Sequence, residues 1–490
     1  MGHSGWSRWR ALSSSSRFDV EFRDLTVRYP DRRADALSAV SERIDEGDVV
    51  AIAGPSGCGK TTLCRTLAGF IPAMIPAEIS GQILLGSEST LGVAPETLAT
   101  RIGLVQQDPE AQICTLNVWQ EVAFGPENLC LPATEVRVRV ERSLDAVGIA
   151  ALRDRTTTTL SGGEKQRLAI ASILAMEPRV LLFDEPTANL DPRGVRSLFA
   201  FLSQQTQAHA RTLVIIEHRI DALRALAPRL LLLDRGRLVD RYPARERLDY
   251  AKLGLRGAWK QEPPGTHAGT NLVEASGVSF GYGEPLLQGL SFSLRAGEVL
   301  AIIGPNGGGK TTLLRLLTGL ETPQSGRIER GREAKIGFVF QHPHHQIFER
   351  TVRREMELEH PDSAAAIDDE LRAARLTGLE DAAPLSLSLG EQRRLTVATA
   401  LARRPDVLLL DEPFIGQDRR NVLWMIDRIR GVTGSGGSVA LVTHDIPLAQ
   451  ALADRVLYLE RSTAWIGPPE EVFDRLRQRG DVEFTPEAWS

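Results

Sequence analysis

Two segments of the chain carry residue types that could bind the phosphates of a nucleotide. Gly54–Thr61 and Gly304–Thr311 each fit the pattern G-x-x-x-x-G-K-[ST], and each follows an apolar run. The glycines let consecutive backbone N–H groups converge on phosphate oxygens, and a helix beginning at the lysine adds the positive end of its dipole. The lysine would neutralise phosphate charge, and the threonine after it would offer a hydroxyl to Mg²⁺. We therefore predict two phosphate loops.

Two further apolar runs end in acidic pairs that could hold a metal ion and activate water. Val180–Glu185 and Val407–Glu412 both end in Asp-Glu. Mg²⁺ is a hard cation that takes oxygen ligands, which fits the first carboxylate of each pair. The second carboxylate could polarise an attacking water. Both pairs would lie at the carboxyl edge of a parallel sheet, where phosphates bind.

The motifs occur twice in the same order, which indicates an internal duplication. The block around Lys60 recurs 250 residues later around Lys310. Short Val/Ile/Leu runs alternate with helical patterns, so each half is predicted to be α/β with a largely parallel sheet. A stretch rich in Gly, Pro and Thr indicates an exposed linker between the halves. We predict a disordered tail at 1–17, domains at 18–250 and 272–490, and a linker at 251–271.

The composition narrows the class of protein. The 490 residues are 42% hydrophobic and 25% charged, which is typical of a globular protein of two or three domains. A net charge of -5 argues against an obligate nucleic-acid binder. The N-terminus lacks the apolar core of a secretory signal, and no apolar run reaches the roughly 18 residues of a membrane span. The four cysteines form no CxxC pair, which argues against a zinc or iron–sulfur site.

The segment Leu160–Arg167, with the sequence LSGGEKQR, is similar to the signature motif of the ATP-binding-cassette (ABC) ATPases. The other motifs of that family follow in its order, and the resemblance covers roughly residues 18–245 and 272–475. It implies two tandem P-loop NTPase domains, each with a mainly parallel core sheet, a helical signature subdomain and a small antiparallel β part. It also implies an enzyme that hydrolyses ATP with Mg²⁺.

The resemblance assigns roles to single residues. Glu185 and Glu412 would be catalytic, together with His218 and His444 at the switch position that contacts the γ-phosphate. The oxygen ligands of Mg²⁺ would come from Thr61, Gln107, Asp184, Thr311, Gln341 and Asp411. The residues expected to contact ATP, including two adenine-stacking tyrosines and the signature residues, are Tyr29, Gly54, Pro55, Ser56, Gly57, Cys58, Gly59, Lys60, Thr61, Thr62, Tyr282, Gly304, Pro305, Asn306, Gly307, Gly308, Gly309, Lys310, Thr311, Thr312, Ser161, Gly162, Gly163, Ser388 and Gly390.

The resemblance further implies a head-to-tail ATP sandwich, in which each phosphate loop faces the signature helix of the other half. The second signature is LSLGEQRR, so Leu389 replaces its first glycine. A leucine adds bulk beside phosphate and disfavours a positive φ, so we expect weaker phosphate contact from this signature. The altered signature would serve the site of Lys60, and the intact one the site of Lys310. We therefore expect the Lys310 site to do most of the hydrolysis.

The segments after Gln107 and Gln341 resemble the ATPases of energy-coupling-factor (ECF) importers. The first continues as QDPEAQIC and EVAFGPENL, and the second keeps only the first part as QHPHHQIF. The resemblance implies a transmembrane coupling subunit, a membrane substrate-binding subunit and a peripheral place at the cytoplasmic face of the cell membrane. It implies uptake of a vitamin, a vitamin precursor or a transition-metal ion.

Other functions remain open. A tandem sugar-importer ATPase has a similar length, but usually carries a degraded second phosphate loop, and Gly304–Thr311 is intact. A twin-cassette translation or ribosome factor usually has a long charged helical linker, which this chain lacks. A metal site at His342, His344 and His345 is an alternative to an exposed turn, and we favour the turn.

Overall fold

The computed structural model describes residues 18–30, 32, 34–220, 223, 226, 228–243, 253–256, 259, 269–331, 334–358 and 364–489. The predicted tail at 1–17 and most of the predicted linker at 251–271 lie outside these residues. The chain divides into two compact units near residue 257, and residues 191–193 group with the second unit. Of the linker residues that are described, Leu255 and Arg256 are buried, so this part of it packs against the protein.

The first unit is built on a six-stranded sheet. Its central strands are short, apolar and almost entirely buried, as the uninterrupted Val/Ile/Leu runs predict for strands covered on both faces. The pairs among β6, β7, β8, β3 and β9 are parallel, and β10 is antiparallel to β9. The order is β10 (Arg237–Tyr242), β9 (Arg229–Asp234), β3 (Val49–Ala53), β8 (Thr212–Ile216), β7 (Val180–Asp184) and β6 (Ile102–Val105).

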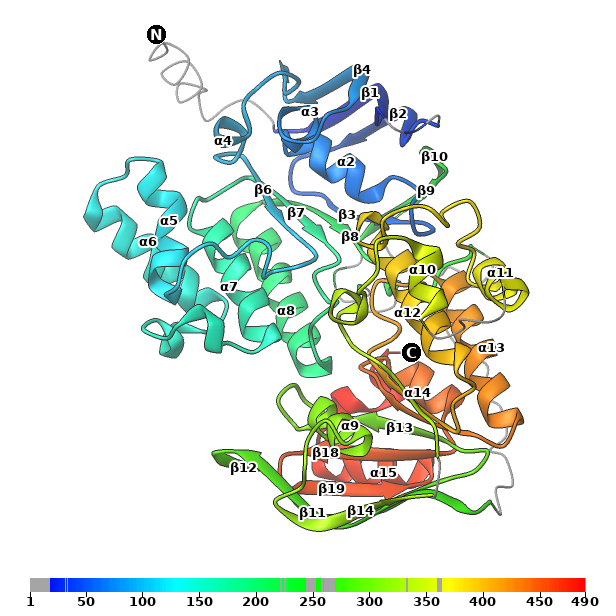
Figure 1. Ribbon diagram of the computed structural model, residues 1–490. Helices are drawn as coiled ribbons and strands as arrows, with labels where there is room; N and C mark the ends of the chain where they lie inside the picture. The colour runs from blue at the N-terminus through cyan, green and yellow to red at the C-terminus, as the bar shows by residue number, and fades with distance from the viewer. Residues whose placement is uncertain are drawn as a thin grey trace. The chain divides into compact units, whose positions relative to one another are not determined.

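A second, antiparallel sheet and a set of helices complete this unit (Figure 1). The sheet order is β2 (Leu37–Ile44), β1 (Val20–Arg28), β4 (Glu78–Leu85) and β5 (Glu88–Ser89). Helices α5, α6 and α7 pack against one another. The helices are α2 (Lys60–Leu67), α3 (Phe70–Ala73), α4 (Pro95–Leu98), α5 (Val118–Asn128), α6 (Ala133–Ala146), α7 (Gly162–Leu174) and α8 (Pro192–His209), with 3₁₀ turns at Ala150–Leu152 and Thr157–Thr159.

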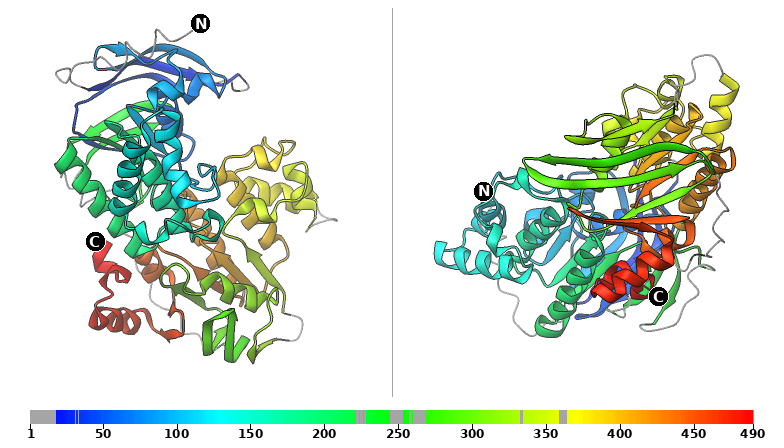
Figure 2. Two further views of the ribbon diagram at one scale, coloured as in Figure 1. Left: turned by 90° about the vertical axis from the view of Figure 1, so that its left-hand side faces the viewer. Right: turned by 90° about the horizontal axis from the view of Figure 1, so that it is seen from below.

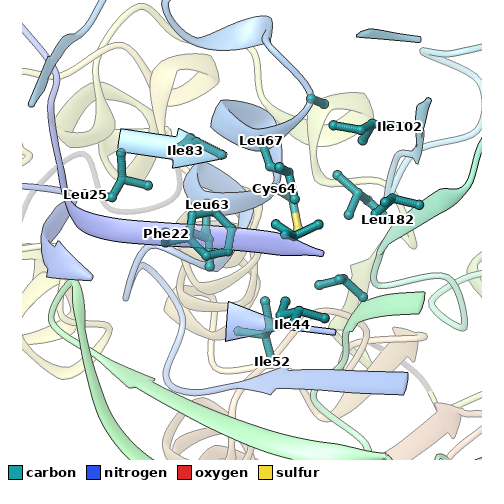
Figure 3. Close-up of a cluster of buried hydrophobic side chains, with 14 of the residues drawn as sticks. Phe22, Leu25, Ile44, Ile52, Leu63, Cys64, Leu67, Ile83, Ile102 and Leu182 are labelled. Carbon is teal, nitrogen blue, oxygen red and sulfur yellow. The ribbon is translucent and has the colours of Figure 1, made fainter. Parts of the chain in front are cut away.

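Helix α2 joins the two sheets of the first unit through one hydrophobic core. Leu63, Cys64 and Leu67 of this helix are buried, and Figure 3 shows them among side chains of both sheets. Phe22 lies on the antiparallel sheet and Leu182 on the core sheet. The helix that follows the phosphate loop is therefore fixed on two sides.

The second unit repeats this plan. Its core sheet has parallel pairs among β15, β16, β17, β13 and β18, and β19 is antiparallel to β18. The order is β15 (Ile336–Val339), β16 (Val407–Asp411), β17 (Ser438–Val442), β13 (Val299–Ile303), β18 (Arg455–Glu460) and β19 (Thr463–Gly467). The long strands of its antiparallel sheet lie side by side in Figure 2 and have the order β12 (Glu284–Arg295), β11 (Asn271–Tyr282) and β14 (Ser325–Arg330).

Helices α10, α11 and α12 of the second unit pack together, as α5, α6 and α7 do in the first. The helices are α9 (Lys310–Thr318), α10 (Val352–Glu357), α11 (Ala364–Ala373), α12 (Leu389–Ala402), α13 (Arg419–Gly434), α14 (Ile446–Leu452) and α15 (Pro469–Arg479). Turns of 3₁₀ helix lie at Pro343–Gln346, Pro384–Ser386, Val482–Phe484 and Pro486–Trp489.

The predicted fold class is confirmed: each unit combines a mainly parallel core sheet, a helical subdomain and a small antiparallel part. Among the described residues no helix is both long and apolar enough to cross a bilayer.

Candidate nucleotide sites

Both predicted phosphate loops connect a core strand to a helix. The first joins β3 to α2 and the second joins β13 to α9. Gly54 and Gly304 open the loops with φ of 151° and 143°. A Cβ at Gly54 would lie 2.0 Å from the carbonyl oxygen of Leu233, and one at Gly304 would lie 2.1 Å from that of Leu459. Only glycine fits where the loop backbone approaches the neighbouring strand this closely.

The two loop lysines are buried and make the same contacts. Lys60 Nζ donates to the carbonyl oxygens of Gly54 and Pro55, at 2.9 and 3.0 Å. Lys310 Nζ donates to those of Gly304 and Pro305, at 2.9 and 2.8 Å. Burial lowers the pKa of the Lys310 ammonium, although the nearby Glu412 and Asp411 carboxylates oppose this effect. An anion bound inside the loop would also raise the pKa of this ammonium and so favour its charged form. The buried lysine therefore suits a phosphate.

The threonine and aspartate expected to hold Mg²⁺ lie together in each unit. Thr61 Oγ1 donates to Asp184 Oδ1 at 3.3 Å, and Thr311 Oγ1 donates to Asp411 Oδ2 at 2.8 Å. Burial and the neighbouring Glu185 raise the pKa of Asp184 to about 6, and burial also raises the pKa of Asp411. A cation beside these carboxylates would lower both pKa values.

Asp411 offers a direct test of this fit. Its Oδ1 atom is buried and has no hydrogen-bond partner among the described residues. A buried acceptor without a partner is costly, and a hard divalent cation would satisfy it. The residues present therefore fit Mg²⁺, which would supply charge neutralisation to the phosphates of ATP.

The glutamate expected to be catalytic in the first unit, Glu185, is contacted at both carboxylate oxygens. His218 Nε2 lies 3.1 Å from Glu185 Oε1, and Gln107 Nε2 donates to Glu185 Oε2 at 2.8 Å. Burial would raise the pKa of Glu185, but the charge and hydrogen bond of His218 outweigh it and lower the pKa overall. Glu185 is therefore held as a carboxylate, and Gln107 contacts it directly.

The second unit holds its glutamate differently. His444 Nε2 lies 3.3 Å from Glu412 Oε1 and 2.9 Å from Asn306 Oδ1 of the phosphate loop. No hydrogen bond from the Gln341 side chain to Glu412 is found among the described residues. Burial raises the pKa of Glu412 to about 7, against the charge of Lys310. The equivalent glutamates therefore ionise over different pH ranges.

Both glutamates share an uncommon backbone conformation. Glu185 and Glu412 each have φ of 49°, in the left-handed region. For a residue with a long side chain this conformation costs energy, and it concentrates at functional sites. The sequence pattern gives the positions of these glutamates but does not show this conformation.

A buried arginine that sequence reasoning missed lies beneath the second site. Arg393 of α12 donates to the carbonyl oxygens of Glu412 at 3.0 Å, Ile415 at 2.6 Å and Gln341 at 2.9 Å. The equivalent residue of the first unit is Gln166, which is 1% exposed and whose Nε2 has no hydrogen-bond partner among the described residues. The sequence signal that could have found it is the arginine in place of glutamine at the seventh position of the motif, LSLGEQRR against LSGGEKQR. One guanidinium of the second unit thus fastens two loops, the one after β15 and the one between β16 and α13.

The signature segments begin two similar helices. Ser161 caps α7 and Ser388 caps α12, and each serine forms a capping box with the glutamate three residues later. Leu389 is the first residue of α12 and is 36% exposed. Neither Gly162 nor Leu389 has a positive φ, and a Cβ at Gly162 would lie 3.9 Å from its nearest neighbours, the Cβ and carbonyl oxygen of Asn189.

The expectation that leucine disfavours the required backbone is therefore wrong, because this helix start uses ordinary helical angles. Only the bulk of the exposed side chain distinguishes Leu389 from Gly162. Gly163 and Gly390 follow in the first turns of their helices. Ser161, Gly162, Gly163, Ser388 and Gly390 thus stay predicted phosphate contacts.

The two tyrosines expected at adenine differ in exposure. Tyr29 is half-buried, packs against the hydrophobic core and shares a hydrogen bond of 3.1 Å with Thr62 Oγ1. Tyr282 is 62% exposed, and its hydroxyl donates to Glu321 Oε1 at 2.9 Å. Tyr282 thus has the freer ring, whereas Tyr29 already packs on one side.

The remaining expected contacts lie along the two loops between Pro55 and Thr62 and between Pro305 and Thr312. In each loop the last glycine caps the following helix: Gly59 before α2 and Gly309 before α9. The loop members between these ends are Ser56, Gly57 and Cys58, and Asn306, Gly307 and Gly308.

The three histidines after Gln341 form a ring cluster. His344 and His345 have centroids 4.3 Å apart, and each lies 5.6 Å from His342. His344 and His345 lie in the 3₁₀ turn Pro343–Gln346, His342 caps its start, and all three histidines are exposed. The predicted exposed turn is therefore confirmed.

Comparison with known proteins decides the family. The family model described as ABC transporter matches residues 37–188 and 287–415. The chain belongs to the ABC transporter family. Two matched stretches agree with the two cassettes predicted from the repeated motifs, and the chain is an ATP-binding protein and an ATPase.

Relatives cover nearly the whole chain. A protein of Methanosarcina acetivorans, provisionally named an ABC transporter ATP-binding protein, is 34% identical over 95% of this chain and 88% of its own length. A protein of Bacillus subtilis, provisionally named the HMP/thiamine import ATP-binding protein YkoD, is 33% identical over 92% of both chains.

A solved structure shares the tandem fold. The archaeal ribosome recycling factor aABCE1, solved in complex with the ribosomal stalk protein aP1, matches with a TM-score of 0.65 at 22% identity. The match covers 93% of this chain and 92% of that chain. At this identity it supports the fold alone.

Proposed function

We propose that this chain is the ATP-hydrolysing subunit of an importer and works at the cytoplasmic face of the cell membrane with separate membrane subunits. The observation that carries the proposal is that one chain brings together two equivalent sets of the side chains expected to bind and hydrolyse ATP. In each set a loop lysine, a Thr–Asp pair and a Glu–His pair lie at the carboxyl edge of the core sheet. Import is favoured by the name of the Bacillus subtilis relative.

The proposed importer is of the ECF type, and the substrate class is a vitamin, a vitamin precursor or a transition-metal ion. The motif segments after Gln107 and Gln341 support this type. The HMP and thiamine in the name of the Bacillus subtilis relative favour the vitamin class over a metal ion. A sugar importer is less favoured because both phosphate loops keep their lysine, threonine and glycines.

The second candidate function is a ribosome or translation factor. Only the fold favours it, through the structural match to the archaeal recycling factor. Tandem cassettes serve many functions, so a shared fold does not identify the partner.

We further propose that the two cassettes of one chain pair head to tail around two ATP molecules with Mg²⁺. In that arrangement ATP holds the cassettes together, and hydrolysis removes part of the contact. A binding and release cycle of this kind can drive movement of a membrane partner.

The experiment is co-purification of the tagged chain from membranes of its source organism, followed by mass spectrometry of the bound proteins. The importer proposal expects a membrane subunit that survives a mild salt wash. The double variant Glu185→Gln/Glu412→Gln is the matched control, because it should lose ATPase activity and keep the partner. Co-sedimentation with ribosomes in place of a membrane subunit would contradict the importer proposal.

A further inference from the structure

Two equivalent surface segments follow Gln107 and Gln341. The same set of hydrogen bonds holds the backbone of both segments, and we call this set the frame. The segments are residues 108–120 in the first unit and 342–354 in the second, and they align without a gap. A buried glutamate braces each segment: Glu121 Oε2 accepts from the backbone N–H groups of Cys114 and Thr115, at 3.1 and 2.8 Å. Glu355 Oε2 accepts from those of Phe348 and Glu349, at 2.9 and 2.7 Å.

Other bonds of the frame repeat in the same way. In the first unit the side chain of Gln112 accepts a hydrogen bond from Gln106 N–H at 3.0 Å. In the second unit the side chain of Gln346 accepts one from Phe340 N–H at 3.1 Å. The first N–H group of each following helix donates to a backbone carbonyl of a neighbouring loop. Val118 of α5 donates to the carbonyl oxygen of Arg155 at 3.1 Å, and Val352 of α10 donates to that of Ala382 at 3.1 Å. The two segments therefore present their outer side chains from equivalent positions.

Each segment, together with the helix that begins in it and the C-cap of that helix, carries large apolar side chains that face solvent. In the second unit Phe348 is 77% exposed and Leu358 is 49% exposed. In the first unit Leu116 is 72% exposed and Phe124 is 49% exposed. Apolar side chains held by a braced backbone on an otherwise polar surface mark an interaction site.

The charges on the two frames are opposite. Segment 108–120 has two acidic residues and no basic residue, and Glu110 forms an ion pair with Lys165. Segment 342–354 has three arginines, three histidines and one glutamate, Glu349. Arg353 is paired with Asp368 at 2.7 Å, but Arg350 and Arg354 have no ion pair among the described residues.

We propose that segment 342–354 binds an acidic cytoplasmic segment of the membrane subunit, whose apolar side chain covers Phe348. We propose that segment 108–120 binds a different segment of that subunit, one without an acidic excess. This inference rests on the proposed importer function. Opposite charges on equivalent frames give each cassette its own partner segment, because like charges brought together at an interface are strongly unfavourable.

A protein segment fits this surface better than RNA does. Phe348 and Leu358 need an apolar partner surface, whereas affinity for a nucleic acid backbone comes mainly from phosphate neutralisation. Only two arginines of segment 342–354 lack an ion pair among the described residues, and the whole chain carries a net charge of -5.

Cross-linking from matched positions tests the inference. Cys114 is exposed and aligns with Phe348, while Cys58 and Cys64 are buried. One probe protein is the full chain with Cys130→Ser, which leaves Cys114 as its exposed thiol. The other carries Cys114→Ser, Cys130→Ser and Phe348→Cys. Each is coupled to benzophenone maleimide, mixed with membranes of the source organism, irradiated and analysed by mass spectrometry.

The expected result is a pair of different peptides from one membrane subunit. The peptide joined at residue 348 should be rich in Asp and Glu, and the peptide joined at Cys114 should not. The same peptide at both positions, a peptide without acidic excess at residue 348, or no adduct there overturns the inference. Adducts with ribosomal proteins or RNA at both positions, or no adduct at either, contradict the proposed function itself.

A charge reversal gives an independent test. Arg350→Glu/Arg354→Glu should reduce recovery of the membrane subunit by about tenfold, because two attractive contacts become repulsive. The matched control is Arg295→Glu/Arg327→Glu on the antiparallel sheet of the same unit, where both side chains are exposed. Equal recovery with both variants would overturn the inference. Melting temperatures of both variants should stay close to that of the unaltered chain, since exposed substitutions change stability little.

Discussion

The two glutamates proposed to be catalytic differ in their hydrogen-bond partners, although both follow a buried strand and an aspartate. Glu185 accepts a hydrogen bond from Gln107 and faces His218, so its charged form is stabilised in the folded protein. Glu412 is more deeply buried than Glu185 and lacks a bond from the glutamine side chain, and burial raises its pKa to about 7. The contributions of Glu185 and Glu412 to the stability of the folded protein should therefore change with pH in opposite directions.

The first prediction concerns Glu412→Gln in the absence of nucleotide and Mg²⁺. A carboxyl whose folded pKa is raised loses stabilising protonation as pH rises from its ordinary value of 4.5 to about 7. At pH 8 the ionised Glu412 is buried at a cost of up to about 3 kcal/mol, which a neutral glutamine avoids. Glu412→Gln should melt at a higher temperature than the unaltered chain at pH 8, and at nearly the same temperature at pH 5.

Glu185→Gln is the matched control and should behave in the opposite way. The pKa of Glu185 is lowered, so its stabilising contribution is present above its ordinary value of 4.5 and lost as pH falls below it. This variant should melt at a lower temperature than the unaltered chain at pH 8. Calorimetric melting curves of the three proteins provide the measurement. A change of the same sign in both variants at pH 8 would contradict the difference in ionisation.

At the scale of elements, helix α12 does more than present the signature. Its Arg393 links the loop after β15, the end of β16 and the segment before α13 through three backbone carbonyls. Helix α7 offers only Gln166 at this place, without an equivalent set of bonds among the described residues. A movement of α12 should therefore reach Glu412 directly, because arginine holds these groups with a rigid planar fork.

We predict that Arg393→Gln lowers kcat for ATP by about tenfold and changes KM for ATP little, because Arg393 positions Glu412 and does not contact the loop lysine. Arg394→Gln is the matched control. Arg394 is also buried and also donates to backbone carbonyls, those of Ala374 and Gly390, but to none near Glu412. Each variant leaves buried carbonyls unpaired, at about 1–3 kcal/mol each. Steady-state ATPase assays should separate them, and an equal loss of kcat in both would show a general effect on the helix.

The elements that sequence predicts well are those with a strong periodic or motif signal. The buried runs of β7 and β16, the phosphate loops and the exposed turn around His344 all follow from local residue types. The brace at Arg393 could not be predicted, because it depends on where three distant carbonyls point. The opposite charges after Gln107 and Gln341 are visible in the sequence, but only the repeated backbone frame shows that they occupy equivalent positions. The backbone argument about Leu389 failed because a helix start needs no positive φ.

At the scale of the whole molecule, both cassettes lie on one chain, and this has a kinetic consequence. If the proposed head-to-tail pairing forms within the chain, the effective concentration of one cassette near the other is set by the connection between them. ATPase activity per molecule should then be independent of protein concentration over a hundredfold dilution series. A marked rise of specific activity with concentration would show that cassettes of different chains must meet.

If the cassettes pair head to tail as proposed, the two ATP sites are expected to be unequal. Head to tail, the signature of α7 would serve the site of Lys310 and Glu412, and the signature of α12 would serve the site of Lys60 and Glu185. At the first helical residue the two signatures differ in one side chain, the exposed Leu389 in place of Gly162. A bulky side chain at that place would hold the γ-phosphate away from the helix N-terminus, and a lost transition-state contact of a few kcal/mol slows a site by about a hundredfold.

We therefore predict that Glu412→Gln lowers the ATPase activity of the complex with the proposed membrane subunits much more than Glu185→Gln does. Gly162→Leu, which copies the second signature into the first, supplies the matched variant. The site at Gly162 has room for the substitution, because a Cβ there would lie 3.9 Å from Asn189. It should lower activity about as much as Glu412→Gln, whereas Leu389→Gly should not lower activity. If Glu185→Gln is as damaging as Glu412→Gln, or if Gly162→Leu has no effect, then the leucine does not set the difference between the sites.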